Sequence, residues 1–288
     1  DNPVGLAAGL DKDGDYIDAL GSLGFGFIEI GSVLPRPQEG NPKPRVFRLP
    51  KAQAIINRLA FNSKGVDHVV EQLERRQYQG VLGVNIGKNR NTPIMSAVED
   101  YRHCMSRLYA HADYITVNIS SPNTEGLRDL QHGEYLDTLL ADLASERSRL
   151  ADKHGRCLPL VVKVAPDLGP KDIARMAESF ARHRIDGVIA TNTTLARDGV
   201  EGLPHSEEAG GLSGAPLKSR ADRVLSQFRA ALPDETALIG LGGITCGEDA
   251  ADKVALGASL VQFYTGMIYE GPDLVAKCVE AIAEMDGS

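Results

Sequence analysis

Short apolar runs recur along the whole chain, and each is followed by a longer amphipathic segment. This alternation is typical of βα units, in which buried parallel strands are covered by helices. Eight such units favour an α/β fold closed into a (β/α)8 TIM barrel, a parallel eight-stranded barrel with its active site at the C-terminal ends of the strands. The expected strands are 4–9, 26–31, 82–86, 113–118, 159–165, 186–191, 237–242 and 259–264.

A chain of 288 residues is close to the roughly 250 that one such barrel uses, so we expect a single catalytic domain over 1–288. The connection 33–63 is too long for an ordinary βα loop, and long loops in compact domains are usually functional. Within it, 45–49 and 54–58 are predicted to form a small hairpin over the barrel mouth. The expected helices are 14–23, 64–77, 95–111, 132–153, 169–183, 217–231, 247–256 and 270–284.

Composition narrows the classes of function. The net charge of −8 argues against a nucleic-acid partner, because phosphate backbones require clustered Lys and Arg. No stretch has the length and hydropathy of a transmembrane helix, and no signal peptide is visible. The four cysteines show neither CxxC pairing nor metal-ligand spacing with histidine, so we expect no metal, and reduced thiols that serve as small buried residues.

Polar residues crowd the ends of the expected strands, where this fold places ligands. The strand 113–118 is followed within six residues by Asn118, Ser120, Ser121, Asn123 and Thr124. Amides and hydroxyls at a buried strand end need hydrogen-bond partners. A bound polar ligand would supply them.

Two further features indicate the chemistry of that ligand. Gly242-Gly243 and Thr265-Gly266 follow the last two strands, where barrels commonly hold a phosphate, and the glycine loop 210–214 suits the same wall. Glycine turns chosen for their backbone angles alone are the alternative. Lys163 lies within an apolar strand and is expected to point into the barrel mouth, as a Schiff-base nucleophile, a fixed cation beside a cofactor, or a structural ion-pair partner.

Four longer motifs are more specific: AAGLDK at 7–12, GNPKPR with FRL at 40–49, INR at 56–58, and NISSPNTEGLR at 118–128. On these motifs the chain resembles dihydroorotate dehydrogenases of the quinone-linked, membrane-associated class (class 2), over residues 2–281. Serine at position 121 separates this class from its soluble relatives, which use cysteine there. Ala60 departs from the family pattern, in which glycine is usual.

The resemblance implies an FMN-dependent oxidoreductase that converts (S)-dihydroorotate to orotate in pyrimidine (UMP) biosynthesis. Ser121 would be the catalytic base for the C5 proton, while C6 delivers a hydride to N5 of FMN and the electrons pass on to a quinone. Lys163 would stabilise the negative charge on the cofactor. We expect the proton to leave through Thr124 and a water molecule, beneath a lid formed by 124–131 in which Gly126 gives flexibility.

The resemblance also implies the binding residues. FMN would contact Ala8, Gly9, Lys12, Ser32, Asn85, Asn118, Lys163 and Thr191, with its phosphate at Gly214, Gly243, Tyr264 and Thr265. The substrate would contact Lys12, Asn57, Arg58, Leu59, Ala60, Phe61, Asn118, Asn123, Asn192 and Thr193.

The family's N-terminal helical segment, which binds membrane and quinone, is absent from the sequence, which begins at Asp1 without a methionine. Through that segment we expect peripheral contact with the cytoplasmic side of the inner membrane, and we expect a monomer. Arg48 and Tyr264 resemble residues of the quinone tunnel, although Arg48 could be an ordinary surface arginine.

Three other readings of the barrel compete with this one. A Schiff-base aldolase could use Lys163 as its nucleophile, but the asparagine-rich mouth has no role in that chemistry. A flavin reductase acting on tRNA uridines would need a basic surface, which the net charge of −8 disfavours. A non-catalytic binding barrel would have little use for Ser121.

Overall fold

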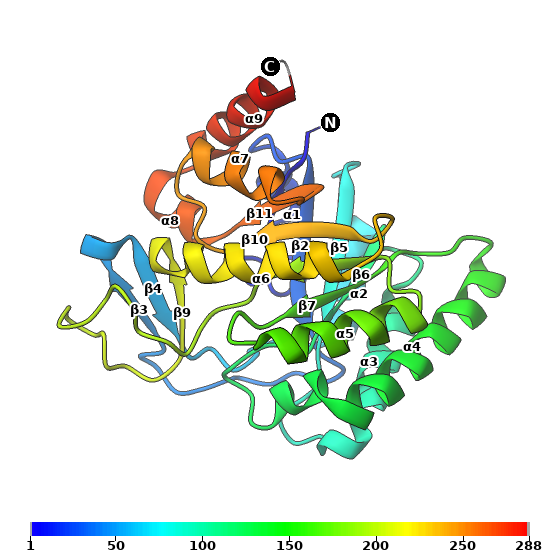
Figure 1. Ribbon diagram of the computed structural model, residues 1–288. Coiled ribbons are helices and arrows are strands. Elements are labelled where there is room, and N and C mark those ends of the chain that lie inside the picture. The colour runs from blue at the N-terminus through cyan, green and yellow to red at the C-terminus, as the bar shows by residue number, and fades with distance from the viewer. Residues whose placement is uncertain (1, 287–288) are drawn as a thin grey trace.

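The structure, a computed structural model, describes residues 2–286 and contains the expected parallel barrel (Figure 1). Its strands close in the order β1-β11-β10-β8-β7-β6-β5-β2, so each of the eight predicted strand regions contains one barrel strand. Residues 1, 287 and 288 of the predicted domain lie outside the described residues. The barrel strands are β1 (Val4–Leu6), β2 (Phe27–Val33), β5 (Val81–Ile86), β6 (Tyr114–Asn118), β7 (Leu160–Val164), β8 (Gly187–Ala190), β10 (Ala237–Leu241) and β11 (Leu260–Phe263).

Helices surround the barrel and follow its strands, as predicted, with one addition (Figure 1). We expected Thr265 and Gly266 to form a loop, but they begin the six-residue helix α8. So short a helix carries no readable apolar period, which is why the sequence did not reveal it. The helices are α1 (Ile17–Gly21), α2 (Val66–Arg75), α3 (Ala97–Leu108), α4 (Gly133–His154), α5 (Pro170–Arg182), α6 (Lys218–Ala231), α7 (Gly247–Ala255), α8 (Thr265–Glu270) and α9 (Asp273–Asp286).

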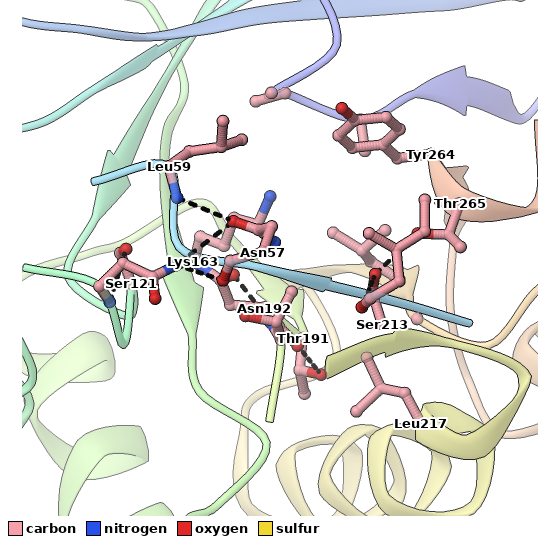
Figure 2. A pocket seen from close by; sticks show the side chains of 18 of the residues that line it. Asn57, Leu59, Ser121, Lys163, Thr191, Asn192, Ser213, Leu217, Tyr264 and Thr265 are labelled. Carbon is pink, nitrogen blue, oxygen red and sulfur yellow. Dashed lines mark hydrogen bonds between the residues drawn. The ribbon is translucent and has the colours of Figure 1, made fainter. Parts of the chain in front are cut away.

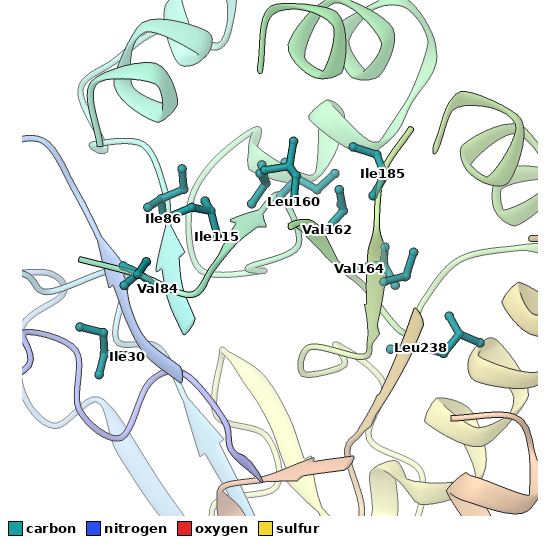
Figure 3. Close-up of a cluster of buried hydrophobic side chains, with 14 of the residues drawn as sticks. Ile30, Val84, Ile86, Ile115, Leu160, Val162, Val164, Ile185 and Leu238 are labelled. Carbon is teal, nitrogen blue, oxygen red and sulfur yellow. The ribbon is translucent and has the colours of Figure 1, made fainter. Parts of the chain in front are cut away.

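The alternation of side chains along each strand divides the core into two parts. Val162 and Val164 of β7 point outward into the large cluster between strands and helices, which Figure 3 shows in part. Val161, on the opposite face of β7, packs with Phe27 and Tyr114 in a smaller cluster inside the barrel. Lys163 is two residues from Val161, so its side chain lies on the same inner face of β7 and points into the barrel.

A three-stranded antiparallel sheet stands beside the barrel, at the left of Figure 1. It consists of β3 (Val46–Leu49), β4 (Ala54–Asn57) and β9 (Gly211–Gly214), so the predicted hairpin is present and has a third strand. Our interpretation of 210–214 as a loop was wrong, because β9 pairs with β4 along its length. Gly210 permits the close approach of this segment to β4, because a Cβ atom there would lie 2.2 Å from the backbone oxygen of Asn57.

All four cysteines are free thiols, and Cys104 and Cys278 are buried as expected. Cys157 is exposed, so the prediction of a buried thiol is wrong at that position, which lies in the connection between α4 and β7. Within residues 2–286, no helix combines the length and the apolar character that crossing a membrane requires.

Candidate active site

A cavity lies at the carboxyl ends of the barrel strands and is roofed by residues of the small sheet (Figure 2). The space between its lining residues is about 1100 Å³, part of which is open solvent. It brings together every predicted site residue except Asn85 and Arg58. Those lining it are Ala8, Gly9, Lys12, Ser32, Asn57, Leu59, Ala60, Phe61, Asn118, Ser121, Asn123, Lys163, Thr191, Asn192, Thr193, Gly214, Gly243, Tyr264 and Thr265.

The cavity is electropositive although the chain is acidic overall. Lys12 and Lys163 line it, and no Asp, Glu or His side chain among the described residues does. Within residues 2–286 neither ammonium group has a hydrogen bond or an ion pair to a protein side chain or carbonyl, and Lys163 is only 5% exposed. Lys163 is buried and Lys12 is half-buried, so an anionic ligand would offset the cost of holding these two charges at the cavity.

Burial shifts the pKa of both lysines downward. Desolvation lowers the pKa of Lys12 to about 8, and the charges of Lys163 and Arg45 add to this shift while Asp13 opposes it. Desolvation also lowers the pKa of Lys163, against the opposing negative charge of Glu29. A ligand carboxylate or an electron-rich ring would therefore stabilise the charged form of each lysine.

The turn after β1 holds Lys12 in place. The buried Asp11 carboxylate accepts hydrogen bonds from the backbone N–H groups of Asp15 and Tyr16, at 3.0 and 2.9 Å. These bonds close the turn that leads into α1, so Lys12 projects toward the cavity from a fixed backbone.

Amide side chains form a continuous hydrogen-bonded chain beneath the cavity. Asn192 Nδ2 lies 3.4 Å from Asn118 Oδ1, Asn118 Nδ2 donates to Ser32 Oγ at 2.9 Å, and Ser32 donates to Asn85 Oδ1 at 2.5 Å. Asn85 is fully buried and is not among the residues that line the cavity, so its predicted contact with the cofactor stays a prediction. It lies one hydrogen bond behind Ser32, because its strand position faces the barrel axis rather than the mouth.

Ser121 lies on the loop after β6 and faces the cavity (Figure 2). Its Oγ accepts a hydrogen bond from the backbone N–H of Asn123 at 3.3 Å. The Asn123 side chain donates to the backbone oxygen of Asn57 at 3.1 Å, which joins this loop to the small sheet. Ser121 is therefore held at the wall of the cavity with a side-chain oxygen whose remaining lone pair can face a ligand.

Arg128 stabilises the C-terminal part of the loop that carries Ser121. Its guanidinium donates to the backbone oxygens of Ser120 and Thr193 and pairs with Asp167 at 2.9 Å. Residues 127–131 form a 3₁₀ helix (Leu127–Gln131) with Leu127 buried. The prediction that 124–131 acts as a lid, and that Thr124 relays a proton, stays a prediction.

The opposite end of the cavity is built from backbone and small side chains. In the view of Figure 2, Ser213, Leu217, Tyr264 and Thr265 lie at this end, away from Ser121. Thr265 Oγ1 donates to Ser213 Oγ at 2.8 Å. Gly243 has φ of +81°, and a Cβ atom there would lie 2.4 Å from Cα of Lys218, so only glycine leaves this wall open.

Arg58 does not line the cavity, and its predicted contact with the substrate stays a prediction. Its side chain turns away from the cavity, pairs with Glu208 at 2.7 Å and stacks over the Phe47 ring at 4.5 Å. Ala60, by contrast, lines the cavity with φ of +56°, a conformation that favours glycine. This backbone geometry gives a physical reason for the glycine that the family usually has there.

Several lining residues escaped the sequence reasoning, among them Val46, Ile55, Pro122, Ser213 and Leu217. Most are apolar and carry no signal that separates them from core residues. Ser213 could have been found, because it sits in the glycine-rich run that we assigned to the phosphate wall. Arg48, named as a tunnel residue, is exposed and lies over the Tyr269 ring at 4.7 Å.

Comparison with known proteins agrees with this geometry. The family model described as dihydroorotate dehydrogenase matches residues 1–285. A Bordetella parapertussis protein named dihydroorotate dehydrogenase (quinone) is 58% identical over 286 residues, covering 98% of this chain and 82% of that protein. A protein of the same name from Burkholderia pseudomallei strain 668 is also 58% identical, over 282 residues, with 98% and 82% of the two chains covered.

Solved structures agree in fold. The structure of the Eimeria tenella DHODH in complex with ferulenol superposes with a TM-score of 0.93 at 39% identity, covering 98% of this chain and 81% of that one. The ligand-free form of the Eimeria enzyme superposes with a TM-score of 0.91 at 40% identity, covering 98% and 84%.

Proposed function

We infer that this chain, which belongs to the dihydroorotate dehydrogenase family, is the quinone-dependent class 2 enzyme of pyrimidine biosynthesis, oxidising dihydroorotate to orotate. We assign the reaction to this cavity on one observation. Lys12 and Lys163 line it without side-chain partners, among amides and, within the described residues, without acidic side chains. Such a site fits a planar imide ring with a carboxylate and an electron-rich cofactor.

Two features of the cavity wall also fit FMN. Gly243, Gly214 and the Thr265–Ser213 pair leave an end without charged side chains, where backbone N–H groups can approach a phosphate. Lys163 and the Asn118 amide, at the other end, offer donors to the polar edge of an isoalloxazine ring. FMN, when bound, supplies the hydride acceptor that no amino-acid side chain can provide.

The substrate would lie between Lys12 and the amides of Asn57, Asn123 and Asn192, with its carboxylate toward the Lys12 ammonium. Ser121 would take the proton from C5, since no histidine or carboxylate lines the cavity to compete for that role. Lys163 would hold a positive charge where negative charge develops on the cofactor.

A quinone acceptor dissolves in the membrane, so we propose that the enzyme works peripherally at the cytoplasmic side of the inner membrane, as a monomer. Tyr264 lines the cavity and Arg48 lies on the neighbouring small sheet, which gives the acceptor a path along this side. Sedimentation of the purified protein, with and without vesicles that contain quinone, tests both statements.

Colour tests the function directly. We expect purified protein to carry bound flavin and to lose its visible absorbance when dihydroorotate is added without oxygen. Quinone should restore the absorbance. A colourless protein that is trapped covalently by borohydride with a carbonyl substrate would support the aldolase reading instead.

The pKa of Lys12 predicts how substrate binding depends on pH. Lys12 is cationic below pH 8 and becomes neutral above it, because burial lowers its pKa to about 8. The ligand carboxylate binds the cation, so the Kd of orotate should rise as the pH increases above 8, by up to tenfold per unit. Titrating the flavin spectrum with orotate between pH 6.5 and 9.5 measures this dependence.

The matched control is Lys12→Met, which keeps the length of the side chain and removes its charge. This variant should bind orotate weakly and with little change between pH 7 and 9. A constant orotate Kd from pH 7 to 9 in the unmodified protein would remove Lys12 from carboxylate recognition.

A further inference from the structure

Glu29 is a fully buried carboxylate inside the barrel that has no part in the mechanism so far. It lies on β2 and accepts hydrogen bonds from side chains of three other strands. Asn85 Nδ2 donates to Oε1 at 2.9 Å, and Tyr114, Thr116 and Gln262 donate to Oε2 at 3.0, 3.1 and 3.1 Å. No Lys, Arg or His of residues 2–286 forms an ion pair with it.

The partners of Glu29 identify it as an ionised acceptor. Gln262 also donates to the Tyr114 hydroxyl, at 3.3 Å, so the tyrosine proton is free to point at Glu29. Oε2 thus receives three donors and Oε1 one, while a protonated carboxyl would have to donate. Four donors and no acceptor therefore surround this carboxyl group, which fits a group that only accepts hydrogen bonds.

This acceptor fixes the direction of every hydrogen bond above it. Because Asn85 must give its N–H to Glu29, its carbonyl faces Ser32, and the Ser32 hydroxyl donates to that carbonyl. Ser32 then accepts from the Asn118 amide, which leaves Asn118 Oδ1 facing Ser120 and Asn192. All donors in the chain point toward the carboxylate, an arrangement in which each bond strengthens the next.

We propose that Glu29 is a positioning residue for the reaction, which sets the donor–acceptor direction of the Asn85–Ser32–Asn118 chain and so decides where the cavity presents N–H groups and where it presents carbonyls. Glu29 does not line the cavity, so it acts on the ligands through other residues. The proposal rests on the proposed function, because its effect is on the binding of a pyrimidine ring and a flavin.

The charge of Glu29 serves the same site in a second way. Its negative charge opposes the desolvation that lowers the pKa of Lys163, and Lys163 has no other acidic residue acting on it. A neutral residue at position 29 would therefore also weaken the cation that faces the cofactor.

Glu29→Gln tests the proposal, because it keeps the shape and replaces one oxygen with an N–H donor. At the Oε2 position the new N–H group would face the donor groups of Tyr114, Thr116 and Gln262, so we expect it at the Oε1 position. Asn85 must then turn its carbonyl toward it, which reverses Ser32 and Asn118. We expect the orotate Kd to rise about tenfold, the effect of one ordinary hydrogen bond. We also expect flavin reduction at saturating dihydroorotate to slow about tenfold.

Thr116→Val is the matched control. It removes one donor from Oε2 but leaves the carboxylate, its charge and the Asn85 contact in place. Both variants should lose thermal stability, since each disturbs the same buried cluster. Only Glu29→Gln should change the orotate Kd and the reduction rate by more than twofold, and Glu29→Asp, which keeps the charge, should recover part of the orotate affinity.

Two results would overturn the proposal: orotate affinity and reduction rate within twofold of the unmodified protein in folded Glu29→Gln, or equal losses in Thr116→Val. If Glu29→Gln does not fold, an atomic-resolution or neutron structure of the unmodified holoenzyme decides, and an Asn85 oxygen facing Glu29 would refute the proposed direction. Flavin content and bleaching of the unmodified protein are measured first, so that failure of the proposed function is recognised separately.

Discussion

Replacing Ser121 by alanine is expected to slow flavin reduction by roughly 10²–10⁴ while orotate binding stays unchanged, because a positioned acid–base group contributes about that factor. The variant loses only the oxygen that would take the C5 proton. No histidine or carboxylate lines the cavity to replace it. Stopped-flow bleaching at saturating dihydroorotate measures the rate, and titration of the flavin spectrum with orotate measures binding.

Ser121→Cys is the informative partner of this variant. A thiol is more acidic than a hydroxyl and can accept the same proton as thiolate, so partial activity should return, with a pH profile displaced from that of the serine enzyme. The backbone bond from Asn123 to the side chain at position 121 can form with sulfur as well. A bleaching rate in Ser121→Ala equal to that of the unmodified protein would remove Ser121 from proton transfer.

The barrel could be predicted because its signal is repeated and local. Each strand is a short apolar run, and the alternation within 159–165 correctly placed Lys163 on the inner face. The hairpin β3–β4 was also local, since its strands are joined by a short turn. In contrast, β9 pairs with a strand far away in the sequence, and the three glycines in the run 210–214 are typical of a loop.

The directions of side chains in the site could not be predicted, for a similar physical reason. The sequence places Arg58 and Asn85 near the cavity, but the directions of their side chains depend on partners distant in sequence: Glu208 for Arg58, and Glu29 for Asn85. Glu29 itself was overlooked although it breaks an apolar strand as plainly as Lys163 does. A charged residue at an inward-facing strand position needs a partner wherever it lies along the strand, so it is as informative in the middle of a strand as at its end.

Substitution of Lys163 by methionine is expected to slow flavin reduction by about 10²–10³ and to weaken FMN retention, because removal of one preorganised charge stabiliser typically has an effect of that order. Methionine keeps most of the side-chain volume, so the barrel should remain packed. Anaerobic stopped-flow reduction and the flavin-to-protein absorbance ratio after dialysis are the two measurements.

Stability should respond in the opposite direction. Burial lowers the pKa of Lys163, which means that folding disfavours its charged form and that the charge costs stability at neutral pH. The cost begins to fall as the pH rises past the lowered pKa, and it is gone only above the ordinary lysine pKa of 10.5. The cofactor-free form of Lys163→Met should therefore unfold at the same temperature as the unmodified protein, or at a higher one, when both are measured at pH 7.

Lys88→Met provides the matched control, since Lys88 is also a buried lysine but lies outside the cavity. Its ammonium donates to the backbone oxygens of Asn89 and Thr92, so its loss should lower the melting temperature and leave flavin reduction unchanged. Comparison of the two variants separates the effect of removing a charge at the cavity from the effect of removing a charge elsewhere in the core. If Lys163→Met has full flavin content and a near-normal reduction rate, the cofactor does not need this cation. The orientation assigned to the cofactor along the cavity would then have to be reversed.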